Sequence, residues 1–255
     1  MEVHHHSDTP KKSWSHYFWE FLMLFLAVTL GFLVENEREH YIEKIRAKDF
    51  SKTLVKDLQN DTAAIHAHIK TTKIYLAIAD SLLSLSQTRL EGREASLFSF
   101  YTRFMYWTVP IVWNRSTFEQ IKNSGSLRFF RNYSLLETMI KYEAIVNRVG
   151  METYHHQIRG NMLLNQINVI IDPSHHYELS KRFIWQLDTM SRKTIESLLA
   201  PTETLENKRP EIKEMLNMMI VQQRNLRFNA EVLWKAAEEL AIALINDLTK
   251  EYRLK

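Results

Sequence analysis

The chain has 255 residues, of which 45% are hydrophobic and 25% charged, a composition typical of a folded protein that buries a sizeable core. The net charge of +3 is spread along the chain without a basic block, which argues against nucleic acid as a partner. The absence of cysteine excludes disulfides, thiolate nucleophiles and thiolate metal sites. With only five glycines and five prolines the chain has few turn signals, so long helices are expected.

The segment from Tyr17 to Val34 is an apolar run in which Glu20 is the only ionisable residue. Its length is close to that of a minimal membrane-spanning helix, and Trp14 lies at its edge, where amphipathic rings favour the headgroup region. A cleaved signal peptide is the alternative, but such a segment ends in small residues, whereas this run passes directly into Glu35 and further charged residues. The sequence therefore predicts an uncleaved membrane anchor.

Helical periodicity continues beyond the apolar run, because apolar residues recur at spacings of three, four and seven. No glycine or proline lies between Phe32 and Glu91, so one helix is expected to run from the membrane to about Ser84, with a turn at Gly92. The residues that carry this pattern are Ile45, Leu54, Leu58, Ile65, Ile69, Leu76 and Leu83.

Two shorter helices are expected next. The first is the aromatic-rich stretch from Ala95 to Trp107, which ends before Pro110. The second is marked by Ser116 with Glu119 three residues later, a capping-box pattern, and by Gly125 as the C-terminal cap. We predict Ser116, Glu119 and Gly125 to be structural caps and not a phosphate-binding cradle.

The remaining helices are predicted over Tyr133 to Ile171, Ser191 to Leu199 and Pro210 to Tyr252, since proline is favoured at the first helical position. The first of these has an apolar stripe that we expect to face the core. Its members are Leu136, Met139, Val146, Val149, Ile158 and Met162. The last has the most regular stripe, namely Ile212, Met215, Met219, Leu226, Ala230, Leu233, Ala237, Leu240, Leu244 and Leu248.

Long helices joined by tight turns predict an all-α fold: one N-terminal transmembrane helix that continues into an elongated antiparallel helical bundle. We divide the chain into a short cytoplasmic segment (1–16), a transmembrane helix (17–34) and a soluble helical-bundle domain (35–255). An intermolecular coiled coil is the alternative. Asp61 and His68 interrupt the heptad series that runs through Leu54, and this favours packing within one chain.

Two stretches resemble an uncharacterised bacterial family of small membrane proteins whose function is not known. Glu20 with Asn36, followed by Leu54-Val-Lys-Asp57-Leu58-Gln-Asn-Asp61, resembles the first recurring stretch of that family, and Thr117 to Arg128 resembles the second. The similarity covers about Glu20 to Asp61 and Trp113 to Val146. It implies one N-terminal span and a helical extracytoplasmic body, and it implies no activity.

Two features of the sequence give opposite predictions for the orientation of the span in the membrane. Lys11 and Lys12 precede the span while Arg38, Lys44 and Arg46 follow it, and this count would place the body in the cytoplasm. Members of the similar family look like proteins with a cytoplasmic N-terminus and a body outside the inner membrane. Large domains also translocate largely regardless of the charges that flank the span. We therefore predict a single-pass protein of the inner membrane, with a cytoplasmic N-terminus and a periplasmic C-terminal body.

One face of the predicted span carries Glu20, Leu24, Ala27 and Gly31. Ala27 and Gly31 form a small-xxx-small pattern, which allows two helices to approach closely, and a carboxyl group in lipid seeks a partner. We consider this face a candidate transmembrane association face. The alternative is that Glu20 lies near the interface and reaches water, since alanine and glycine are common in spans.

The histidines occur in three close pairs: His66 with His68, His155 with His156, and His175 with His176. Ligands on one helix need spacings of three or four to share a face, so these pairs do not predict a metal site. The aromatic residues from Phe98 to Tyr106, with Trp107 and Trp113, either line a ligand pocket or form the packed end of the bundle, and packing is the more common role.

No nucleophile elbow, P-loop or dinucleotide fingerprint occurs, so we predict neither catalytic residues nor a cofactor, and no enzyme activity. Two functions remain: a membrane-anchored helical scaffold that presents its body to a protein partner or a second copy, and a sensory or ligand-binding bundle. Receptors of the second kind need a second span to pass on a signal, and the C-terminal segment from Asp247 to Lys255 is polar. The scaffold is the preferred prediction.

Overall fold

The structure is a computed structural model that describes residues 13–106, 110–171, 177, 181–201 and 203–254. Within these residues every regular element is a helix and no strand occurs, so the all-α prediction is confirmed. The contacts between residues divide the chain into two compact units, Met1–Phe50 and Ser51–Lys255. The second unit contains the helical bundle.

Helix α1 spans Trp14–Ser86, two residues beyond the end predicted from the sequence. Its N-terminal part contains an 18-residue window with a mean hydropathy of 2.0, none of which is buried. By length and composition this helix is sufficient to cross a membrane, a property that a signal sequence near the N-terminus shares. The coarse prediction of one long apolar N-terminal helix is therefore confirmed.

The other helices agree with the predicted order. Their bounds are Gly92–Thr102 for α2, Ser116–Asn123 for α3, Tyr133–Ile170 for α4, Arg192–Leu198 for α5, Arg209–Phe228 for α6 and Lys235–Tyr252 for α7. A π-helical segment, η6 (Asn229–Trp234), joins α6 to α7 without a break, so one continuous helical path covers the predicted range to Tyr252. Short 3₁₀ helices lie at Ser126–Phe129, Ile184–Thr189 and Glu206–Lys208.

The C-terminal helical path runs antiparallel to the part of α1 that belongs to the bundle. Gln223 in α6 donates a 2.6 Å hydrogen bond to Asp80, near the end of α1. Glu238 in α7 pairs with His66, further back along α1. Because the residue numbers rise along one helix as they fall along the other, the two are antiparallel, as the fold prediction requires.

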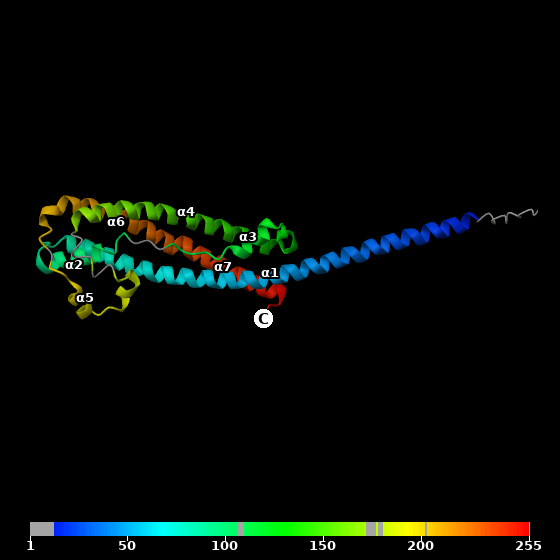
Figure 1. The fold of residues 1–255 in the computed structure, drawn as a ribbon, viewed down its shortest axis with the longest axis horizontal. Helices are drawn as coiled ribbons and strands as arrows, with labels where there is room; N and C mark the ends of the chain where they lie inside the picture. Colours follow the sequence, from blue (N-terminus) through cyan, green and yellow to red (C-terminus); the bar gives the residue numbers. More distant parts are fainter. Residues whose placement is uncertain (1–12, 107–109, 172–176, 178–180, 202, 255) are drawn as a thin grey trace, which may run out of the picture. The chain divides into compact units, whose positions relative to one another are not determined.

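Helix α4 runs antiparallel to α6 and α7, and Figure 1 shows it lying alongside them. It runs parallel to α1, since Tyr142 in its first half bonds to Asp61 and His156, further along, lies near His68. The connection from α1 to α4 contains the two shorter helices predicted from the sequence, α2 and α3. Its chain returns along α1, with Met105 bonded to Tyr75 and Asn114 bonded to Asp61.

Two adjacent basic residues cap the ends of two different helices. The ammonium group of Lys208 donates to the carbonyl oxygens of Val169 and Ile170, at 3.1 and 2.8 Å, at the end of α4. The guanidinium group of Arg209 donates to the carbonyl oxygen of Ser86 at 2.6 Å, at the end of α1. Helix C-termini have unsatisfied carbonyl groups and partial negative charge, so these cations hold the two ends together.

The core stripe of α4 differs in its second half from the predicted one. Met139, Val146 and Val149 are buried as expected, but Ile158 and Met162 are exposed. The stripe continues instead through His156, Gly160, Leu163, Ile167 and Ile170. The prediction considered apolar residues only, whereas the buried position one turn after Thr153 is occupied by His156.

Candidate functional site

The four residues of the predicted association face all lie on the exposed surface of α1, in the first unit. Glu20, Leu24 and Ala27 line one shallow groove, and Nε2 of His16 lies 3.0 Å from the carboxyl group of Glu20. A Cβ atom added to Gly31 would meet no atom within 4 Å. The face is therefore open in the single chain, and its association with another helix stays a prediction.

The substitution Gly31→Leu tests this association. Because nothing in the chain itself contacts that position, we expect Gly31→Leu to lower the yield of crosslinked oligomers in membranes several-fold through a clash between two helices. Crosslinking in native-like membranes measures the effect. Thr29→Leu is the control and should leave the yield unchanged, because Thr29 lies two residues from both Ala27 and Gly31 and therefore on the other side of the helix. Equal yields for both variants would reject the association face.

The predicted capping box does not form. Ser116 is the first residue of α3, Arg115 occupies the N-cap position, and no side chain caps the helix. The carboxyl group of Glu119 instead accepts a 3.0 Å hydrogen bond from Arg115, which also pairs with Glu143 of α4. Gly125 follows the helix with a φ of 69°, the left-handed conformation in which helices commonly end.

Asp61 is the centre of a buried polar cluster. Its side chain is 2% exposed and accepts hydrogen bonds from the backbone N–H of Asn114 at 2.8 Å, from the Asn114 amide at 3.0 Å and from the Tyr142 hydroxyl at 2.6 Å. Burial, followed by the hydrogen bond to Asp61, raises the pKa of the Tyr142 hydroxyl. Since both carboxyl oxygens have partners, the arrangement suits a structural link between α1 and α4.

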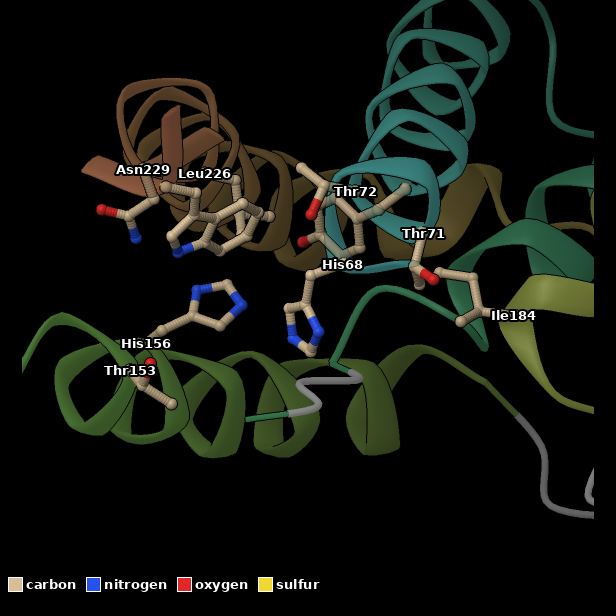
Figure 2. Close-up of a pocket in the computed structure, with 10 residues that line it drawn as sticks. His68, Thr71, Thr72, Thr153, His156, Ile184, Leu226 and Asn229 are labelled. Carbon is tan, nitrogen blue, oxygen red and sulfur yellow. The ribbon is translucent and has the colours of Figure 1, made fainter. Parts of the chain in front are cut away.

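A cavity of about 50 Å³ lies further along the bundle. Helix α1 contributes His68 and Thr72, α4 contributes Thr153 and His156, and the π-helical segment contributes Asn229 (Figure 2). In Figure 2 the rings of His68 and His156 extend toward each other from α1 and α4. The remaining lining residues are Thr71, Tyr75, Ile184, Leu226 and Trp234.

His156 is 8% exposed, and burial, together with the positive charge of Arg159, lowers its pKa to about 4. The imidazole is therefore neutral near pH 7 and has one donor and one acceptor nitrogen. Gln222 accepts from Nε of Arg159 at 3.3 Å through its carbonyl oxygen, so its amide nitrogen is the group 3.3 Å from Nε2 of His156. Nε2 must then accept, and the ring proton lies on Nδ1.

Two buried polar atoms of the cavity residues have no hydrogen-bond partner in the described part of the chain: Nδ1 of His156 and Oδ1 of Asn229. Asn229 is 4% exposed. A buried polar group without a partner is unfavourable by about 1–3 kcal/mol, so such atoms are uncommon in native proteins.

Sequence reasoning missed this cavity for two reasons. Each histidine pair was considered along its own helix, whereas the structure brings one member of each of two pairs, His68 and His156, together across helices. The predicted stripe of the last helix contains Ala230 and does not name Asn229. His175 and His176 lie outside the described residues. Among the residues that are described, no group of three or more histidine, cysteine, aspartate or glutamate side chains is placed to hold a metal ion.

The aromatic stretch before Pro110 belongs to the core. Phe98, Phe100 and Phe104 are buried in the main hydrophobic cluster, and the hydroxyl of Tyr75 donates a 2.9 Å hydrogen bond to the carbonyl oxygen of Met105. Trp107 lies outside the described residues. Of the two alternatives for this stretch, the packed one agrees with the structure.

Comparisons of this chain with protein families, with curated proteins and with solved structures find no match. The resemblance of Glu20 to Asp61 and of Trp113 to Val146 to a bacterial membrane-protein family therefore stays a prediction. Any functional conclusion rests on the geometry of the chain itself.

Proposed function

We propose that the protein is a non-enzymatic, single-pass membrane-anchored helical scaffold that presents its bundle to a protein partner. One observation supports this most strongly: the apolar window of α1 is exposed on all sides. Met23, Leu24, Val28 and Phe32 are between 66 and 71% exposed. Exposed apolar side chains in a continuous helix of this length are stable in a bilayer, where the helix satisfies its own backbone hydrogen bonds.

Helix α4 supports the partner-binding part of the proposal. Met151, Tyr154, Ile158 and Met162 are exposed large apolar residues at spacings of three and four, so they share one face of the helix. Contiguous apolar surface of this kind on a soluble body is typical of an interaction site. A protein partner or a second copy of the chain is the proposed occupant.

We further propose that the N-terminus is cytoplasmic and that the body lies in the periplasm. The absence of native cysteine allows a direct test with single introduced cysteines. A membrane-impermeant maleimide should label the Gln157→Cys variant in intact spheroplasts and the Ser13→Cys variant only after lysis, since the two positions lie on opposite sides of the span. The reverse pattern would place the body in the cytoplasm.

Alkaline extraction of the same membranes distinguishes an uncleaved anchor from a cleaved signal sequence. An anchored protein stays in the membrane pellet after alkaline extraction and has the mass of the full chain. A product that is shortened and released would contradict the anchor.

A ligand-binding bundle is the second candidate, and the cavity between α1, α4 and η6 is the observation that favours it. Purification from native membranes in a mild detergent discriminates between the two candidates. A stoichiometric protein supports the scaffold, and a retained small molecule supports the ligand-binding bundle.

A further inference from the structure

We propose that the outward face of α4 binds the same face of a second copy of this chain, so that the two α4 helices form a parallel coiled coil. This inference rests on the proposed function, because it identifies the protein partner of the scaffold. The face, called the outward stripe below, consists of six exposed residues: Ile140, Ala144, Asn147, Met151, Tyr154 and Ile158.

The first argument is the position of the outward stripe. Met151 and Tyr154 follow the buried residues Val146 and Val149 by five residues, which places them on the side of α4 that faces away from the core. The four large apolar residues of the stripe are between 41 and 63% exposed. A contiguous apolar face of this kind is stabilised when a partner removes it from water.

The second argument is the shape of the outward stripe. From Ile140 to Ile158 its residues follow one another at alternating intervals of four and three, which is the seven-residue repeat of a coiled coil. Only these positions carry the stripe, and polar or charged residues lie on both sides of it. A stripe this narrow fits one neighbouring helix, whereas a helix that lies on a broad core or in a lipid surface has a wider apolar face.

Asn147 is the polar member of the outward stripe. Its amide oxygen accepts a 2.8 Å hydrogen bond from Arg115, so the side chain has a partner within its own chain. A single asparagine in the seam of a coiled coil fixes the register at a cost in stability, because it favours another polar group opposite it. A second copy in the same register supplies that group by symmetry.

The third argument is the distribution of charge beside the outward stripe. In a parallel pair each side of one helix faces the opposite side of its partner, so Arg148 approaches the partner's Glu143. In an antiparallel pair like sides meet, and two basic sides would face each other. Glu143 already pairs with Arg115, so this complementarity affects the orientation more than the affinity. The basic side consists of Lys141, Arg148 and His155, and the other side of Glu143, Gly150 and Gln157.

The membrane anchor strengthens the pairing. From Ile140 to Ile158 the outward stripe is about 27 Å long, which is short for a coiled coil, so its affinity in solution is expected to be low. Two copies anchored in one membrane have a higher effective concentration than two free copies, and association then requires fewer contacts. This step is the one that depends on the proposed function.

Single introduced cysteines test the pairing, because the chain has no native cysteine. In a parallel pair in register each position meets its own copy. Ile140→Cys and Ile158→Cys should therefore both form disulfide-linked dimers when membranes that contain the full chain are oxidised with copper phenanthroline. An antiparallel pair would bring at most one of these two positions next to its own copy. Gln157→Cys, exposed and one residue from the stripe, is the control and should yield at least fivefold less dimer.

A second substitution tests the seam itself. Met151→Glu places two carboxylates opposite each other in the pair and should lower the dimer yield of the Ile158→Cys variant at least tenfold. Lys213→Glu, at an exposed position of α6, should leave that yield unchanged. Since Met151 is 62% exposed, Met151→Glu should preserve the helix content, which circular dichroism measures.

Three results would overturn the parallel pair. The first is equal dimer yields for Ile158→Cys and Gln157→Cys, and the second is a yield that Met151→Glu does not lower. The third is dimer formation at only one of Ile140→Cys and Ile158→Cys, which indicates an antiparallel pair. If these crosslinks fail and a different protein copurifies in stoichiometric amount, the second copy is rejected and the scaffold stands. Release of the chain by alkaline extraction would contradict the anchor whether or not the crosslinks form.

Discussion

Replacing Asp61 with alanine is expected to lower the free energy of unfolding by about 2–3 kcal/mol, because the buried hydroxyl of Tyr142 loses its acceptor together with two less buried donors of Asn114. These donors are the backbone N–H and the side-chain amide of Asn114 and the hydroxyl of Tyr142. The substitution also removes the hydrogen bonds that join α1 to α4 and to the returning segment at Asn114. Denaturant unfolding of the full chain in mild detergent, followed by far-UV circular dichroism, measures the change.

Asp188→Ala is the matched control for Asp61→Ala. Asp188 forms a 3.1 Å ion pair with Lys70 in which both side chains are well exposed, and such pairs contribute about 0–1 kcal/mol. Tyr142→Phe removes one donor from the buried cluster and should lower the unfolding free energy by about 1 kcal/mol. Equal effects of Asp61→Ala and Asp188→Ala would show that the buried cluster does not stabilise the bundle.

Acid is expected to destabilise the bundle through His156. Burial and Arg159 lower the pKa of His156 from 6.5 in the unfolded chain to about 4 in the folded protein. The folded state therefore prefers the neutral ring, and the unfolded state binds the proton first as the pH falls. The contribution to stability is complete above pH 6.5 and declines until the pH reaches about 4. At 1.36 kcal/mol per pKa unit, the loss is about 3 kcal/mol.

Two neighbouring histidines make this prediction specific. His156→Gln removes the titrating group, and the unfolding free energy of that variant should decline about 3 kcal/mol less between pH 7 and pH 4 than that of the parent chain. His155→Gln, at an exposed position next to it, should behave as the parent chain does. Carboxyl groups that titrate over the same range contribute equally to both variants. Identical pH profiles for the two variants would contradict the buried, neutral state of His156.

The helices of this protein follow from local sequence. Few glycines and prolines interrupt the chain, so the predicted end of α1 near Ser84 lies two residues from the observed one, and the helix that opens at Pro210 begins at Arg209. Helix propensity and apolar periodicity act over one or two turns, and residues close in the sequence are sufficient to predict them. The same holds for the exposed apolar window at the N-terminus.

The candidate site depends on contacts that no local pattern contains. His68 and His156 are far apart in the sequence and belong to two different helices, α1 and α4. The parallel course of α1 and α4 places them at the same level, and that course depends on the long return of the chain past Asp61 and Tyr75. Only packing across helices could show that these residues line one cavity.

The sequence by itself determined the all-α class, the order of the helices, the extent of the long ones and the apolar N-terminal helix, whereas α2 ends at Thr102 and not at the predicted Trp107. Each of these is a property of one segment and of its own periodicity. The tertiary structure alone decided that α4 is parallel to α1, that His156 replaces the expected apolar residues in the core stripe, and that Asn229 is buried in a π-helical segment. These features minimise the free energy of the whole bundle, in which one segment accepts a locally unfavourable conformation because contacts with two others compensate for it.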